Sequence, residues 1–156
     1  MIDSSQISYL IAAVVVLVGL VTLGFFIREG LVTSSLYNQA VKLYQEKDYK
    51  AAQSAFQNVL SRHPSNDIAR LLLGESLMQL GKIEDATSQL NDLTRRAPKN
   101  ADAQLRLGTA LMKQEKLENA IAAFTKAKEL FLKQKNPQKA EQIEQLLQQL
   151  SNSDQV

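Results

Sequence analysis

Residues 67–100 read DIARLLLGESLMQLGKIEDATSQLNDLTRRAPKN, and the segments on either side repeat the pattern of this stretch at an offset of 34 residues. In each copy a small residue is followed twelve positions later by an alanine and four positions after that by a bulky side chain. The three sets are Ala40, Ala52 and Phe56; Gly74, Ala86 and Leu90; and Gly108, Ala120 and Phe124. Self-similarity at a fixed period of this length is the signature of a repeat architecture.

This pattern resembles the tetratricopeptide repeat, in which each unit is a helix, a tight turn and an antiparallel helix. Pro64 and Pro98 close the first two copies, as that pattern requires. The sequence therefore predicts three repeats, over residues 33–66, 67–100 and 101–134. One such unit cannot bury its apolar face alone, so the units are expected to stack into an all-α solenoid.

The ends of the predicted helices carry capping signals. Asp48, Asp67 and Asn100 are N-cap candidates, since their side chains can accept a hydrogen bond from the first turn of a helix. Leu132 stands where the third repeat should have its closing proline, so that helix is expected to run on towards residue 135. Asn136 and Pro137 then predict the start of a C-terminal capping helix over 137–150, followed by a frayed tail at 151–156.

The small residues of the repeats are expected to have a structural role. Gly74 is predicted to face Ala86, and Gly108 to face Ala120, where the two helices of a unit cross most closely. Ala52 has the same register in the first repeat. A larger side chain at any of these positions would overpack the crossing.

The first 32 residues differ sharply from the rest. After a leader at 1–6, residues 7–27 contain no charged side chain, and 21 residues of helix extend roughly 32 Å, which matches the hydrocarbon core of a bilayer. We expect a transmembrane helix here and a short juxtamembrane linker at 28–32. The alternative, a cleaved signal peptide, is disfavoured because the leader has no basic residue and no small-x-small site follows the apolar stretch.

The orientation of this span follows from its flanks. The N-terminal flank has no lysine or arginine, whereas Arg28, Lys42, Lys47 and Lys50 follow the span. The positive-inside rule therefore predicts that the repeats lie on the cytoplasmic or stromal side of the membrane.

Composition excludes several classes of function. The net charge is only +2, and charges of both signs are interspersed, so nucleic acid is not expected as a partner. The chain has no cysteine and a single histidine, His63, which rules out thiolate chemistry and a histidine metal site. We also find no paired carboxylates, serine elbow or phosphate-binding glycine loop. We predict a protein that is not an enzyme and binds no cofactor or metal.

A functional surface is expected on the first helix of each repeat, which lines the concave face of such a solenoid. Positions that share one helical stripe there are mostly apolar, and they form a candidate partner-binding groove. The stripe comprises Tyr37, Val41, Tyr44, Ile68, Leu71, Met78, Leu105 and Met112. An apolar stripe at helical spacing can equally be core, and the sequence leaves these two interpretations open.

Charged residues suggest two further points. Some proteins of this kind bind chaperone tails through a basic clamp on the concave face, but only Arg106 fits that clamp here, with Tyr37, Val41, Leu72 and Asp102 at its other places. No chaperone-tail clamp is therefore expected. Two basic clusters, residues 95–99 and 126–139, are most simply solvated helix faces, and anionic lipid headgroups are the alternative ligand.

In architecture the whole chain resembles the photosystem I assembly proteins of cyanobacteria and plastids, the hypothetical chloroplast reading frame thirty-seven family. The shared features are a charge-free span, an abrupt start to three repeats, and the Leu73-Gly74 and Leu107-Gly108 pairs. The resemblance implies a thylakoid anchor and a non-catalytic scaffold that binds subunits of photosystem I. The competing hypothesis is an envelope protein that serves a secretion or cell-wall machine with its repeats on the far side of the membrane.

Overall fold

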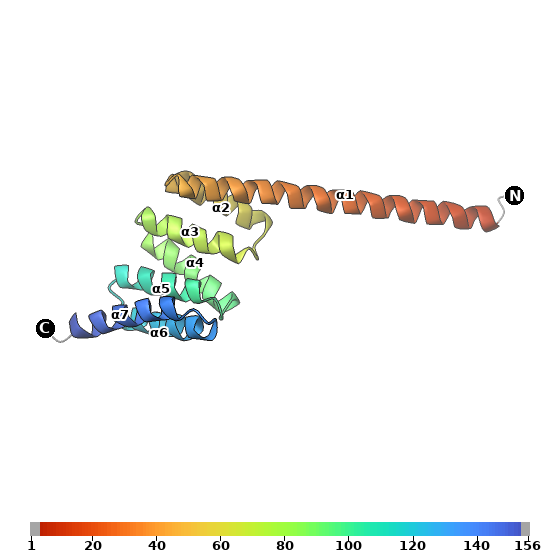
Figure 1. Cartoon of the computed structure of the whole chain (residues 1–156). Coiled ribbons are helices and arrows are strands. Elements are labelled where there is room, and N and C mark those ends of the chain that lie inside the picture. The colour runs from red at the N-terminus through yellow and green to blue at the C-terminus, as the bar shows by residue number, and fades with distance from the viewer. Residues whose placement is uncertain (1–3, 154–156) are drawn as a thin grey trace.

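The computed structural model describes residues 4–153, and these form seven α-helices. Their bounds are α1 Ser4–Gln45, α2 Tyr49–Arg62, α3 Asp67–Gln79, α4 Ile83–Arg96, α5 Ala101–Lys113, α6 Leu117–Lys133 and α7 Pro137–Ser153. Successive helices run antiparallel and pack side by side in a stack, with the N-terminal part of α1 projecting far beyond it (Figure 1). The predicted fold is confirmed: an all-α, three-repeat solenoid with one long apolar helix at its N-terminal end and a capping helix at its C-terminal end.

Local signals determine where the helices of the solenoid begin. Asp48, Asn100 and Asn136 each accept a hydrogen bond from a backbone N–H in the first turn that follows, at 3.0, 2.9 and 3.2 Å. The prediction for α3 was wrong by one residue: Asn66 is the N-cap and Asp67 is already helical. Asn66 accepts from Ala69 at 2.9 Å, so the amide takes the role that we had given to the carboxylate.

The turn inside each repeat uses the same backbone geometry. Lys47, Gly81 and Glu115 lie 34 residues apart, and all three have positive φ, at 61°, 73° and 60°. Each of them donates its backbone N–H to a carbonyl three residues earlier, closing the helix end. Only Gly81 adopts this left-handed conformation without steric cost.

A continuous apolar core runs through the stack. The largest fully buried side chains include Phe56, Leu90, Phe124 and Phe131, which lie on second helices of the repeats. Helix α6 is 17 residues long against 14 for α2 and α4, as expected where the closing proline is missing. Its added length brings Phe131 against α7, whose Ala140 and Ile143 are buried in the same core.

The small residues lie in the core, but their partners differ from the prediction. Ala52, Ala86 and Ala120 are fully buried. A Cβ atom on Gly74 would meet the Leu90 side chain at 2.9 Å, and one on Gly108 would meet the Phe124 ring at 2.6 Å. The atoms nearest to each glycine thus belong to the bulky residues one helical turn beyond Ala86 and Ala120.

Helix α1 is continuous across the segment that we expected to be a linker. Residues 28–32 are helical, and so are residues 4–6 of the expected leader and residues 151–153 of the expected tail. The juxtamembrane segment is therefore helical, because no proline in it interrupts the helical hydrogen bonds. The remaining positions of the leader, 1–3, and of the tail, 154–156, lie outside the described residues.

Within α1, the stretch Ile11–Arg28 has a mean hydropathy of 2.5, and none of it is buried against the rest of the chain. It has the length and composition of a membrane span, and an N-terminal signal sequence can share both properties. Exposing so many apolar side chains to water would be unfavourable by about 25 cal/mol per Å². Among the described residues, no other part of the chain covers this stretch of α1.

Candidate partner-binding surface

The first helices of the repeats form the inner layer of the solenoid. Within the described residues, α1 contacts α3 and α3 contacts α5, whereas the second helices α2, α4 and α6 contact only helices adjacent in sequence. Closer approach on one side of a stack makes that side concave. The concave surface of this protein is therefore built from α1, α3 and α5.

The predicted stripe lies mostly against the core. Six of its side chains are half-buried and pack on core residues: Tyr37, Val41, Tyr44, Leu71, Leu105 and Met112. Met78 is only 9% exposed, and Ile68 is 60% exposed. The structure brings Tyr44 and Met78 together in one hollow, and Ile68 is the member of the stripe that stands most clear of the core.

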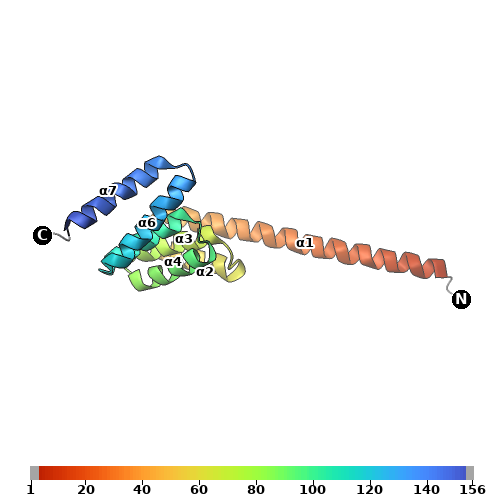
Figure 2. The ribbon, with the colours of Figure 1, turned by 90° about the horizontal axis from the view of Figure 1, so that it is seen from below.

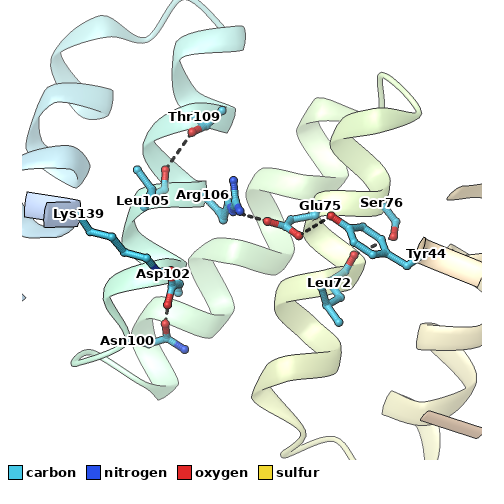
Figure 3. Close-up of polar contacts among 11 residues, drawn as sticks. Tyr44, Leu72, Glu75, Ser76, Asn100, Asp102, Leu105, Arg106, Thr109 and Lys139 are labelled. Carbon is cyan, nitrogen blue, oxygen red and sulfur yellow. Dashed lines mark hydrogen bonds and ion pairs between the residues drawn. The ribbon is translucent and has the colours of Figure 1, made fainter. Parts of the chain in front are cut away.

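A polar cluster crosses the middle of this surface. Tyr44 of α1 donates its hydroxyl hydrogen to Glu75 Oε2 of α3 at 2.8 Å, and Arg106 of α5 forms an ion pair with Glu75 Oε1 (Figure 3). The three residues are spaced 31 apart, one helical turn short of the repeat period, so each lies on the next inner helix. The cluster thus ties together the first helices of all three repeats.

The carboxylate at the centre of this cluster is buried. The side chain of Glu75 is only 9% exposed, and a buried carboxylate is tolerated only when it is paired and hydrogen-bonded. Burial of Tyr44, followed by its hydrogen bond to Glu75, raises the pKa of the Tyr44 hydroxyl from 10.0 to about 12. Tyr44 is therefore a neutral hydrogen-bond donor at any physiological pH. Its ring also packs edge to face on Tyr49 of α2, with the ring centroids 5.8 Å apart.

The hollow around the cluster is small. Its volume is about 140 Å³. Its lining residues are Tyr44, Glu75, Met78, Gln79, Arg106, Thr109 and Lys113. Small-molecule sites usually occupy about 300–1,000 Å³, so this hollow has room for a single side chain of a protein ligand and not for a cofactor.

A second ion pair closes the far end of the same surface. Lys139 of α7 lies 2.8 Å from Asp102 of α5 (Figure 3). The Nζ atom of Lys139 also lies 4.8 Å from the centre of the Phe131 ring. Asp102 and Arg106, which occupy two of the clamp positions considered above, are thus both paired within the chain. The concave surface offers apolar and neutral polar contacts more than free charge.

The part of the chain that the structure describes contains no candidate metal site. Among residues 4–153 no three histidine, cysteine, aspartate or glutamate side chains lie close enough together to hold a metal ion. The carboxylates that are buried or half-buried on the concave surface, Glu75 and Asp102, each have a basic partner.

Sequence reasoning missed the cluster as a unit. It assigned Tyr44 to the apolar stripe and considered Arg106 only as a clamp residue, without connecting either of them to Glu75. The spacing of 31 residues was the available signal. It places the three side chains on successive first helices, each one helical turn earlier in its repeat than the last, and these helices contact each other in the structure.

Comparison with protein families matches this chain to two models, each described as the tetratricopeptide repeat. One covers residues 43–101 and the other residues 101–134. Together they span 43–134, more than half of the chain. No curated protein matches the chain by sequence.

Solved structures share the fold. The type III secretion translocator chaperone SycD of Yersinia enterocolitica superposes with a TM-score of 0.75 at 18% identity, over 79% of this chain and 86% of that one. PcrH of Pseudomonas aeruginosa, in complex with the chaperone binding region of PopB, gives 0.69 at 19%, over 72% and 91%. The TPR2B domain of yeast Sti1, in a complex with pHsp70, gives a TM-score of 0.72 at 18% identity, over 78% of this chain and 97% of that one.

Proposed function

Starting from the fact that this chain belongs to the tetratricopeptide-repeat family, we propose that it is a membrane-anchored, non-catalytic scaffold that binds a protein subunit of a neighbouring membrane complex. The ligand contacts the concave surface of α1, α3 and α5. In line with the architectural resemblance described above, the complex is photosystem I, the membrane is the thylakoid, and the repeats lie on its cytoplasmic or stromal side.

One observation carries this proposal. The exposed apolar stretch Ile11–Arg28 continues without interruption into the helix that begins the first repeat. If the stretch spans a bilayer, about five residues of helix, or roughly 8 Å, separate the end of the span from the solenoid. A concave surface held that close to the lipid meets subunits of membrane complexes before it meets freely diffusing proteins.

The nature of the ligand is supported by the surface and by its likeness to solved structures. Half-buried apolar side chains, a hollow with room for one side chain and methionines that adapt their shape suit a helix or an extended segment. PcrH was solved in complex with the chaperone binding region of PopB, and the TPR2B domain of yeast Sti1 in a complex with pHsp70. Because the sequence identity to these structures is below 20%, the likeness shows a shared fold and nothing more.

Binding is tested by capturing photosystem I from solubilised membranes with the full-length chain. The variant Ile68→Ala combined with Met112→Ala shortens two stripe residues while sparing Tyr44 of the polar cluster and the buried Met78. Truncating an apolar anchor typically costs about 2 kcal/mol of binding energy, so capture should fall by at least tenfold. The matched control is Leu132→Ala on α6, which is 54% exposed against 60% for Ile68 but lies outside the concave surface. Equal capture by both variants would refute the groove.

Topology is tested separately. The chain has no cysteine, so Ser153→Cys provides a single reactive site at the end of α7. In intact cells a membrane-impermeant maleimide should label this site only after the membrane is opened. Labelling of intact cells would instead favour the envelope-side subunit of a secretion or cell-wall machine, and detergent-free release of the chain by salt would exclude a span altogether.

A further inference from the structure

Three turns of the solenoid lie on the same side as the projecting part of α1. Because the helices alternate in direction, the turns α2–α3, α4–α5 and α6–α7 all lie at the edge that faces along α1 towards its N-terminus (Figures 1 and 2). The turns α1–α2, α3–α4 and α5–α6 lie at the opposite edge. If α1 spans a membrane, the first set of turns faces the lipid and the second set faces away from it.

The two edges differ in charge. We count each turn from the last residue of one helix to the N-cap of the next. The near turns contain five basic residues and no acidic one, and we call these five the basic edge: Arg62, Arg96, Lys99, Lys133 and Lys135. The far turns contain four lysines, Lys47, Lys82, Lys113 and Lys116, and three acidic residues. Positive charge is therefore concentrated on the edge nearer the span.

Most of this charge is not neutralised within the chain. Arg96, Lys99, Lys133 and Lys135 are exposed, and none of them forms an ion pair with another residue in the range 4–153. Their nearest acidic neighbours in sequence, such as Asp92, already have partners: Asp92 lies 3.1 Å from Arg70. The four side chains are thus available to an anion from outside the chain.

The edge also has a shape that fits a headgroup. A hollow of about 520 Å³ lies between the α4–α5 turn and the end of α6. Its lining residues are Pro98, Lys99, Lys126, Leu130, Lys133 and Gln134. Gln134 Nε2 donates to the backbone carbonyl of Lys99 at 3.0 Å and so holds the two turns together. Lysines around an apolar floor suit an amphipathic molecule with an anionic head.

We propose that the basic edge docks on the anionic headgroups of the same bilayer that α1 spans, and thereby fixes how the solenoid stands on the membrane. The inference rests on the span in the proposed function. Only about five residues of α1, or roughly 8 Å of helix, separate the end of the span at Arg28 from the first repeat at residue 33, which is about one Debye length at physiological salt. Each lysine or arginine near such a surface favours the docked state by about fivefold.

The test uses the full-length chain reconstituted into vesicles without any other protein. A fluorophore on Gln138→Cys, at the start of α7, reports on the basic edge, and one on Asn119→Cys, at the start of α6, reports on the opposite edge. The quencher is a lipid with a nitroxide on its headgroup. We expect strong quenching of the Gln138→Cys label in vesicles that contain anionic phosphatidylglycerol and weak quenching in pure phosphatidylcholine, with the Asn119→Cys label unquenched in both.

Two variants with the same change in net charge distinguish the effect of the basic edge from the effect of total charge. Changing Arg96, Lys99, Lys133 and Lys135 to glutamine should lower the docking equilibrium by about several hundredfold and abolish lipid-dependent quenching. Changing Lys47, Lys82, Lys113 and Lys116 to glutamine removes the same charge from the opposite edge and should leave quenching intact. Molar salt should act like the first variant, since the Debye length then falls to about 3 Å.

The outcomes are distinguishable. A chain that does not float with vesicles at high salt has no span, and both proposals fail. A chain that floats but shows the same quenching in anionic and neutral vesicles, or in both quadruple variants, overturns the docking alone. In that case the ligand of the basic edge would be an acidic segment of a protein partner.

Discussion

Gly108→Ala is the substitution for which the structure makes the sharpest prediction. A single methyl group at this position would lie 2.6 Å from two atoms of the Phe124 ring and 3.0 Å from a third. Ordinary contacts are 3.4–4 Å, so the ring or the helix would have to move by about 0.8 Å. Phe124 is only 1% exposed, which leaves the ring no open space to enter.

Two opposing effects determine the magnitude. Replacing glycine by alanine inside a helix favours folding by about 1 kcal/mol. Overpacking a tight core costs about 1–3 kcal/mol, and a clash with a rigid buried ring belongs at the upper end of that range. We therefore expect Gly108→Ala to lower the free energy of unfolding by about 1–2 kcal/mol.

Urea unfolding of the full-length chain in mild detergent, followed by circular dichroism, measures this change. The matched comparison is Gly74→Ala, where the new methyl group meets the flexible Leu90 side chain at 2.9 Å and the loss should be smaller. The double variant Gly108→Ala with Phe124→Leu should be more stable than the sum of the single changes predicts, by about 1 kcal/mol. A Gly108→Ala chain more stable than the unmodified chain would refute the packing described for α5 and α6.

Three more changes follow from the packing, the turns and the polar cluster. Ala86→Leu should destabilise the solenoid by about 1–3 kcal/mol in the same assay, whereas exposed Lys82→Ala should change stability by less than about 0.5 kcal/mol. Glu115→Gly should stabilise it by up to about 1 kcal/mol, because glycine removes the strain of a positive φ; an unchanged urea midpoint would contradict this. Since the folded-state pKa of Tyr44 is about 12, above the 10.0 of an ordinary tyrosine, the stability that Tyr44 contributes should be complete below pH 10 and lost as pH rises through 12. Ultraviolet titration should show one late-ionising tyrosine that is absent from Tyr44→Phe.

The fold could be predicted because its signals are local. Asp48 and Asn100 cap the helices next to them, and the missing proline at Leu132 lengthens α6, so in each case a few neighbouring residues determine the outcome. The side chain nearest to Gly108 depends instead on how α5 and α6 are shifted along each other. A shift of one helical turn would bring Ala120 and not Phe124 nearest to Gly108, and the repeat period does not specify this shift.

The candidate site was less predictable for the same reason. The Tyr44–Glu75–Arg106 cluster joins three helices, and its existence depends on the offset between neighbouring repeats. The sequence placed Tyr44 and Met78 on one stripe, but it did not indicate that Met78 is buried or that Tyr44 is held by Glu75. It also identified the basic clusters, yet only the alternating direction of the helices assigns them to one edge.

If α1 spans a bilayer as proposed, its continuity fixes the rotation of the concave surface about the axis of the span. Each residue of an α-helix turns the chain by about 100° and advances it by about 1.5 Å, so one residue inserted between 28 and 33 would swing the concave surface about a quarter turn around the anchor while hardly raising it. Seven inserted residues, close to two full turns, would restore the direction and lift the solenoid by about 10 Å. Under the proposed anchoring, the number of residues between the span and the first repeat would therefore determine which way the concave surface faces in the plane of the membrane.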